Sequence, residues 1–234
     1  KVYFYNGVRS TPQISFTIRN KKAIAGAMIS ASHNPSSDNG IKVYWDTGRQ
    51  VVPPHDAKII EKVNNVGRIE FYNFDQAVSE GKIVMLGEEV DMAYEQTVAK
   101  LSLSDYRDAH IVFTPLHGCA STSFLPVLRA AGFSRLDTVE LQMPFDPEFS
   151  AVANHIPNPE MPISLNVATK QAQESGADLV VASDPDADRI GVVSRASLSS
   201  DEYVFLNGNQ IGVLLFDYIV RQRKAAGSLP EHGV

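Results

Sequence analysis

The chain has 234 residues and a formal net charge of −6, with 44% hydrophobic and 21% charged residues. This composition is typical of a soluble globular protein of one or two domains, and the acidic balance argues against nucleic acid as a partner. No apolar run reaches the roughly 18 residues that a membrane span needs, and the single cysteine, Cys119, allows no internal disulfide. We therefore expect a cytoplasmic protein with no membrane partner.

Residues 1–86 are predicted to form a first α/β unit. Asp46-Thr47-Gly48 is typical of a hairpin turn, because glycine supplies the positive φ that such turns need. A helix is expected after Pro53-Pro54, since proline is tolerated in a first helical turn. Residues 66–86 are predicted to be a link with weak strands. The expected strands lie at residues 2–5, 14–18, 23–29, 41–45 and 50–52.

Residues 87–195 are predicted to form a second unit with the order β-α-β-α-β, which requires a parallel sheet with right-handed crossovers. Its expected helices lie at residues 90–101, 124–132 and 163–175. Its expected strands lie at residues 110–113, 136–141 and 178–182. Residues 196–234 offer one strand and one helix, which cannot close a core, so they are expected to open a third domain. The predicted fold class is α/β, with mixed-to-parallel sheets sandwiched by helices in repeated domains.

The loop after residue 29 carries a candidate nucleophile. Ser32 and His33 are neighbours in Ser30-Ala31-Ser32-His33-Asn34-Pro35, between two expected strands. A serine beside a histidine on a tight loop can act as a nucleophile. An isolated Ser-His-Asn-Pro is more often a turn whose serine bonds its own backbone, so the interpretation depends on a second stretch.

That second stretch, Ser183-Asp184-Pro185-Asp186-Ala187-Asp188-Arg189, follows an expected buried strand and indicates a cation site. Three carboxylates this close repel one another unless a cation or water neutralises them, and oxygen ligands favour Mg²⁺, Mn²⁺ or Ca²⁺. A calcium EF-hand is excluded, because Arg189 and Arg195 stand where it needs glycine and glutamate. The aspartate-nucleophile phosphatase pattern fails too, since its fifth residue would be Asp188 or Ile190. A solvated acidic turn stays open as the alternative.

The two stretches complement each other chemically. A magnesium site with three carboxylates still needs oxygen from a phosphate or from water. Phosphorylated Ser32 would supply such an oxygen, and Arg189 would be available for a charge-assisted hydrogen bond to the phosphoryl group. This pairing makes the two loops more informative together than either is alone.

Together the loops resemble those of the α-D-phosphohexomutases, the family that includes phosphoglucomutase and phosphomannomutase. Residues 30–35, with Asn39-Gly40-x-Lys42, are similar to the family's phosphoserine loop, and residues 184–189 to its magnesium loop. Residues 114–118 and 157–160 resemble further family segments in the right order. Residues 39–45 are most similar to the phosphoglucomutase and phosphopentomutase branch, whereas Gly118-Cys119-Ala120-Ser121 departs from the glycine-richer family pattern.

The resemblance implies a role for each site residue. Ser32 would carry the phosphoryl group with His33 beside it, Lys42 would be the general acid or base for the sugar hydroxyl, and Arg189 would steady the phosphoserine. The implied ligands of one Mg²⁺ are Ser32, through its phosphate, and Asp184, Asp186 and Asp188. His117 is expected to be structural, and Cys119 to be a reduced structural thiol.

The implied activity is a Mg²⁺-dependent intramolecular phosphotransferase that interconverts sugar 1-phosphates and 6-phosphates, or 5-phosphates, through a phosphoserine and a sugar bisphosphate. The implied partner is a phosphosugar. Because family segments are missing before Lys1 and after Val234, we expect the chain to be part of a longer enzyme and to be inactive alone. Two alternatives stay open: a metal-dependent sugar phosphatase that uses the same loops, and a non-catalytic module that binds sugar phosphate or metal.

Overall fold

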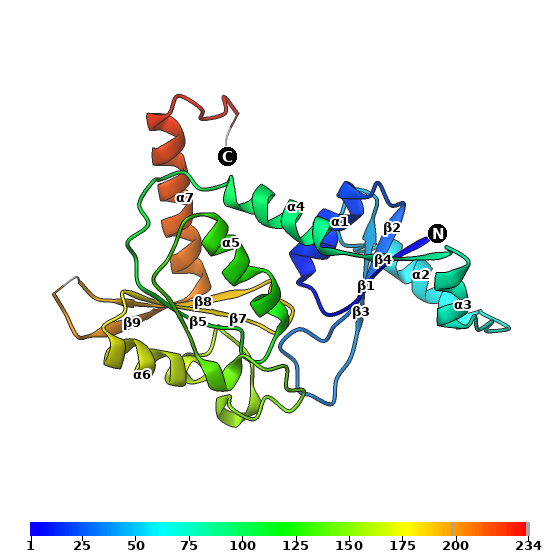
Figure 1. Cartoon of the computed structure of the whole chain (residues 1–234), viewed down its shortest axis with the longest axis horizontal. Helices are drawn as coiled ribbons and strands as arrows, with labels where there is room; N and C mark the ends of the chain where they lie inside the picture. The colour runs from blue at the N-terminus through cyan, green and yellow to red at the C-terminus, as the bar shows by residue number, and fades with distance from the viewer. Residues whose placement is uncertain (198, 233–234) are drawn as a thin grey trace.

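Three sheets carry the fold of the computed structural model, which describes residues 1–197 and 199–232 (Figure 1). The strands are β1 Val2–Tyr5, β2 Ala25–Ile29, β3 Ile41–Trp45, β4 Ile83–Leu86, β5 Ile111–Thr114, β6 Leu136–Thr138, β7 Leu179–Ser183, β8 Ile190–Arg195 and β9 Tyr203–Leu206. The α-helices are α1 Thr11–Asn20, α2 His55–Asn64, α3 Phe74–Ser79, α4 Glu88–Ala99, α5 Phe124–Ala130, α6 Asn166–Ser175 and α7 Gly208–Ala225. None of these described helices is long and apolar enough to cross a membrane.

The first unit holds two small sheets. β1 pairs in parallel with β4, and β2 pairs antiparallel with β3, so that Ile29 lies opposite Ile41. The loop between β2 and β3 is closed by a hydrogen bond from Ser30 N to the Gly40 oxygen, 2.9 Å long. The serine loop thus projects from the end of a hairpin. Residues 66–86 contain α3 as well as β4, and so hold more regular structure than expected.

The strand predicted at residues 14–18 is wrong, because this stretch lies inside α1. Its apolar residues Ile14 and Ile18 are four apart, which fits one face of a helix as well as an irregular strand pattern. Pro12 stands in the first helical turn, where proline is tolerated. Ile18 is buried, and a Cβ on Gly26 of β2 would lie 2.4 Å from its Cδ1, so packing of the helix against β2 decides the conformation.

The turn predicted at residues 46–48 is confirmed, since Gly48 has a φ of 76° and its N–H donates to the Trp45 oxygen at 2.9 Å. The returning strand predicted at residues 50–52 is wrong. Only one bridge, between Tyr44 and Gln50, follows the turn in the part of the chain that the structure describes. The chain leaves the pairing at Pro53-Pro54 and enters α2, as expected.

The second unit is a five-stranded sheet in the order β6-β5-β7-β8-β9. β5, β6 and β7 are parallel, as the β-α-β-α-β pattern predicted, and β8 and β9 are antiparallel additions. In Figure 1, α6 lies below the sheet and α5 and α7 lie above it. Two clusters of buried side chains fill the space between the sheet and its helices; they include Val112, Val180 and Leu165 on one face and Phe113, Val181 and Leu125 on the other.

Two boundaries differ from expectation. The strand expected at residues 136–141 ends at Thr138 and continues as a 3-10 helix, Glu140–Gln142. Tyr203–Leu206, which we expected in a third domain, pairs with β8 and extends the second sheet. The division of the chain at residues 86/87 and 195/196 stays a prediction.

The two units meet along α4, which packs against α1 of the first unit and α5 of the second. Arg9, just before α1, forms a two-pronged ion pair with Asp91 of α4, with both N···O distances at 2.8 Å. Gln13 of α1 donates to the same carboxylate at 2.6 Å. These contacts hold α1 against α4, and Ser32 lies beside Asp184 at the carboxyl end of β7, where ligands of parallel sheets gather.

Candidate active site

The two loops singled out in the sequence touch each other. Ser32 Oγ donates a hydrogen bond to Asp184 Oδ2 at 2.6 Å, although the two residues are 152 positions apart in the chain. The structure brings together all of the site residues that the sequence predicted. They are Ser32, His33, Lys42, Asp184, Asp186, Asp188 and Arg189.

Asp184 lies at the end of β7 and is fully buried. Its Oδ1 accepts the backbone N–H groups of Asp188 and Arg189, at 3.1 and 2.9 Å, so the loop folds back on its own first carboxylate. Burial raises the pKa of Asp184 to about 7, with the charge of Asp186 adding to it and the Ser32 hydrogen bond opposing it. Asp184 can therefore hold or release a proton near neutral pH.

Asp186 is buried but heavily bonded on one oxygen. Its Oδ2 accepts from Lys42 Nζ at 2.6 Å, Ser30 Oγ at 2.8 Å and Thr11 Oγ1 at 3.1 Å. Burial works against the charged form, but the hydrogen bonds from Lys42 and Ser30 outweigh it and lower the pKa of Asp186. Its other oxygen, Oδ1, is buried without a hydrogen-bond partner.

Lys42 bridges two of the three aspartates. Besides Asp186, its Nζ donates to Asp188 Oδ2 at 2.8 Å, and the lysine side chain is 17% exposed. Burial opposes the ammonium form, yet the hydrogen bonds to both carboxylates raise the pKa of Lys42 above its ordinary value. In this arrangement Lys42 carries its proton at neutral pH.

His33 connects the nucleophile to Arg189. Its Nδ1 lies 3.3 Å from Ser32 Oγ, and its Nε2 lies 3.2 Å from Arg189 Nη1. A guanidinium only donates, so Nε2 accepts. Burial, with the charge of Arg189, lowers the pKa of His33, and the neutral ring then carries its proton on Nδ1. His33 therefore donates to Ser32, and the group placed to accept the Ser32 proton is Asp184.

Sequence reasoning missed two residues at this site. The sequence indicates no role for Thr11, yet besides its side-chain contact its backbone N–H donates to the main-chain carbonyl oxygen of Asp186 at 2.8 Å. Ser30 was noted only as part of the loop motif. A Thr-Pro pair signals the start of a helix, but no sequence signal shows that this helix begins against a loop more than 170 positions away.

The loop after β5 supports the aspartate loop. A Cβ on Gly118 would lie 2.2 Å from Pro185 Cα, so only glycine allows this approach, and Cys119 N donates to the Pro185 oxygen at 2.8 Å. Burial raises the pKa of Cys119 to about 12, in keeping with the structural thiol expected. His117 is structural as expected, because Nδ1 pairs with the Pro144 oxygen at 2.8 Å and Nε2 accepts from Ala151 N at 3.1 Å.

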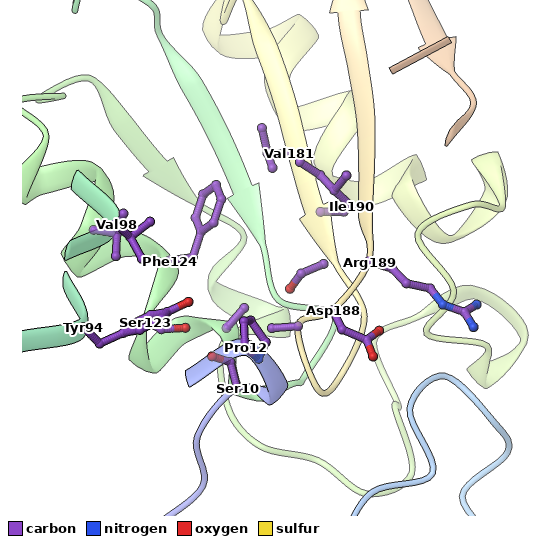
Figure 2. A pocket seen from close by; sticks show the side chains of 15 residues that line it. Ser10, Pro12, Tyr94, Val98, Ser123, Phe124, Val181, Asp188, Arg189 and Ile190 are labelled. Atoms are coloured by element: carbon purple, nitrogen blue, oxygen red, sulfur yellow. The ribbon is translucent and has the colours of Figure 1, made fainter. Parts of the chain in front are cut away.

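A small cavity of about 250 Å³ lies behind the aspartate loop, between α4, α5 and the end of β7. It is lined largely by apolar side chains, among them Phe124, Val181 and Ile190. Figure 2 shows the Arg189 side chain extending away from this cavity. The Arg189 guanidinium, which contacts His33, therefore points away from the cavity.

The aspartate loop fits a divalent cation. Among the described residues, Asp184, Asp186 and Asp188 each offer a carboxylate oxygen, and these oxygens lie within 4.8 Å of one another. The unpartnered Oδ1 of Asp186 is the kind of buried oxygen that a metal ion satisfies. An all-oxygen donor set suits Mg²⁺, Mn²⁺ or Ca²⁺, so these three residues could hold a metal.

The two units together form an α/β protein in which a serine loop lies against an aspartate triad. The family models for phosphoglucomutase/phosphomannomutase alpha/beta/alpha domains I and II match residues 1–70 and 90–197. The chain belongs to the phosphoglucomutase/phosphomannomutase family. The resemblance inferred from the two loops and the predicted α/β fold class are thereby confirmed.

Individual relatives agree with this assignment. A phosphoglucomutase of Staphylococcus haemolyticus is 35% identical over 238 residues, which cover 100% of this chain and 42% of that protein. A solved protein of Thermus thermophilus, described as a phosphomannomutase, superposes with a TM-score of 0.75 at 26% identity over 95% of this chain and 47% of its own. A variant N-acetylphosphoglucosamine mutase of Aspergillus fumigatus, solved with glucose 1,6-bisphosphate, shares the fold with a TM-score of 0.52 at 14% identity, over 93% and 52%. The chain thus spans about half or less of the length of these relatives.

Proposed function

We propose that this chain supplies the phosphoserine and metal half of the active site of a sugar-phosphate mutase. The whole protein would interconvert a sugar 1-phosphate and 6-phosphate, or 5-phosphate, as an intramolecular phosphotransferase. The observation that carries the proposal is the 2.6 Å hydrogen bond from Ser32 Oγ to Asp184. It joins a nucleophile to the cation-binding loop of the other unit, as phosphoryl transfer requires, and relatives such as the S. haemolyticus protein bear the name phosphoglucomutase.

In the proposed cycle, Ser32 passes its phosphoryl group to a free hydroxyl of a sugar monophosphate, which becomes a bisphosphate. The bisphosphate turns round, and its other phosphoryl group returns to Ser32, leaving the isomeric monophosphate. In the first transfer Ser32 Oγ leaves phosphorus and takes a proton from Asp184, and in the return transfer it attacks phosphorus and gives that proton back. Lys42 accepts the proton of the attacking sugar hydroxyl in the first transfer and returns it to the leaving sugar oxygen in the second, and Arg189 donates to the phosphoryl oxygens.

The metal proposed for this site is Mg²⁺, held by Asp184, Asp186 and Asp188 together with a phosphate oxygen on Ser32. When bound, it would neutralise charge on the phosphoryl oxygens. The proposed partners are phosphosugars, with a sugar bisphosphate as activator, and the proposed location is the cytoplasm. The residues of this chain position the serine and bind the phosphoryl group, and the rest of the sugar pocket belongs to the whole protein.

The test incubates the full-length protein with Mg²⁺ and glucose 1,6-bisphosphate and measures its intact mass. We expect a gain of one phosphoryl group that the Ser32→Ala variant lacks and the Ser37→Ala variant keeps, since Ser37 is an exposed serine of the same loop. With glucose 1-phosphate, the product should be glucose 6-phosphate. Release of free phosphate without isomer would identify a phosphatase, and full mutase activity in Ser32→Ala would refute the assignment of the nucleophile.

A further inference from the structure

One hydroxyl group links the nucleophile to an aspartate of the cation loop. Ser30 Oγ accepts the backbone N–H of Ser32 at 2.9 Å and lies 2.8 Å from Asp186 Oδ2. An N–H group only donates and an ionised carboxylate only accepts, so the single hydroxyl proton of Ser30 must point to Asp186. The Ser30 hydroxyl therefore connects Ser32 to Asp186, which lie far apart in the sequence. It accepts from the Ser32 N–H and donates to the Asp186 carboxylate.

The first partner of this hydroxyl is held in an unfavourable backbone conformation. Ser32 has a φ of 53°, in the left-handed region that residues with a Cβ seldom adopt. Its N–H has the Ser30 hydroxyl as its acceptor, and Ser30 itself is anchored through its backbone to Gly40. The Ser30 hydroxyl thus stabilises the turn that aims the Ser32 side chain at Asp184.

The second partner is a carboxylate with one saturated and one free oxygen. Ser30 Oγ, Thr11 Oγ1 and Lys42 Nζ all donate to Oδ2 of Asp186, whereas Oδ1 has no hydrogen-bond partner. Turning the carboxylate out of this orientation would break all three hydrogen bonds. The donors therefore fix the orientation of the Asp186 carboxylate, and with it the position of the oxygen that is left for a cation.

We propose that Ser30 is a positioning residue that sets the Ser32 backbone and the free oxygen of Asp186 at the same time. The inference rests on the proposed function insofar as it concerns phosphoryl transfer. Ser30 does not take part in the chemistry. Because it bonds both halves of the site, its loss disturbs the nucleophile and the cation loop together, which loss of Thr11 or Lys42 would not do.

The test compares Ser30→Ala, which removes the hydroxyl, with Ser30→Thr, which keeps it. Ser37→Ala is the matched control, because Ser37 lies in the same loop but bonds only to the exposed Asp38. In the metal-free protein, we expect the Ser32 amide hydrogen of Ser30→Ala to exchange at least about tenfold faster. Titration with Mn²⁺ alone, followed by electron paramagnetic resonance, should show about tenfold weaker binding, as for the loss of other groups that orient metal ligands.

In the full-length protein, phosphorylation of Ser32 by glucose 1,6-bisphosphate should slow at least about tenfold in Ser30→Ala, with KM for the sugar changed less than about twofold. Ser30→Thr should restore Ser32 amide exchange, Mn²⁺ affinity and rate. If Ser30→Ala does not fold, Ser30→Cys, which keeps the shape but donates weakly, should show the same losses in smaller degree.

Wild-type amide exchange and wild-type Mn²⁺ affinity in Ser30→Ala would overturn the proposal, as would losses that Ser30→Thr fails to restore. The proposed function fails in a different way, namely if wild-type Ser32 is never phosphorylated. In that case, faster exchange and weaker Mn²⁺ binding in Ser30→Ala would still support the positioning role, and their absence would still refute it.

Discussion

Replacing Asp184 by asparagine tests whether burial holds a proton on this carboxyl group. Asparagine has the same shape, and its oxygen can still accept the N–H groups of Asp188 and Arg189 that now bond to Oδ1. Its amide nitrogen would take the place of Oδ2 and donate to Ser32 Oγ. The substitution therefore removes the ionisation while keeping the local hydrogen bonds.

The expected magnitude follows from the pKa of Asp184, which rises from 3.8 to about 7 on folding. Between these values the folded chain binds the proton more tightly than the unfolded chain, so the free energy of unfolding falls as the pH rises. At 1.36 kcal/mol per pKa unit, the full effect is about 4 kcal/mol well above pH 7. Between about pH 5.5 and 7.5, the free energy of unfolding falls by about 2 kcal/mol of this total.

The assay is urea unfolding in the presence of EDTA at these two pH values. We expect the wild type to lose about 2 kcal/mol more stability between them than Asp184→Asn does. Asp201→Asn is the control, because Asp201 is fully exposed. We expect the stability of this variant to change between the two pH values by as much as that of the wild type. Parallel pH dependence in the wild type and in Asp184→Asn would refute the argument that burial raises this pKa.

Three further outcomes are expected. Gly118→Ala should destabilise the chain by about 1–3 kcal/mol in urea unfolding, because its Cβ would overlap the backbone of Pro185. A loss below about 0.5 kcal/mol would contradict the close approach. Cys119, with its pKa of about 12, should react with iodoacetamide at pH 8 much more slowly in the folded chain than in urea, and equal rates would show that the thiol is accessible. Leu165→Ala should lower the free energy of unfolding by about 2–5 kcal/mol, since Leu165 is fully buried between the sheet and α6. A smaller loss would mean that neighbouring side chains fill the space left by the leucine.

The sequence was most informative where one local pattern has one structural outcome. The apolar run before Asp184 predicted β7, and the spacing of the three aspartates predicted that their carboxylates gather. At residues 14–18 the pattern was compatible with both a strand and a helix, and packing of Ile18 against Gly26 made the choice. Residues 203–206 were expected in a third domain but form β9 of the second sheet, because a short strand gives no sign of the sheet in which it will pair.

The candidate site shows the same limit. Ser32 and the aspartates belong to recognisable stretches, so they could be found without coordinates. Thr11 and Ser30 each contact Asp186, which is 175 and 156 positions away from them. Hydroxyl side chains are common in turns and at helix starts, and such residues become notable only when the fold places an acceptor beside them.

The position of Lys42 reconciles its implied role with the contacts that it makes. Three carboxylates share a small volume, and the structure balances them with the Lys42 ammonium at Asp186 and Asp188 and with the raised pKa of Asp184. Both the Lys42 ammonium and the raised pKa of Asp184 reduce the repulsion among the carboxylates, as a bound divalent cation would. A cation bound by these carboxylates, as proposed above, would replace Lys42 as their counter-ion. In the proposed mechanism its ammonium would then face a sugar oxygen instead of the two aspartates.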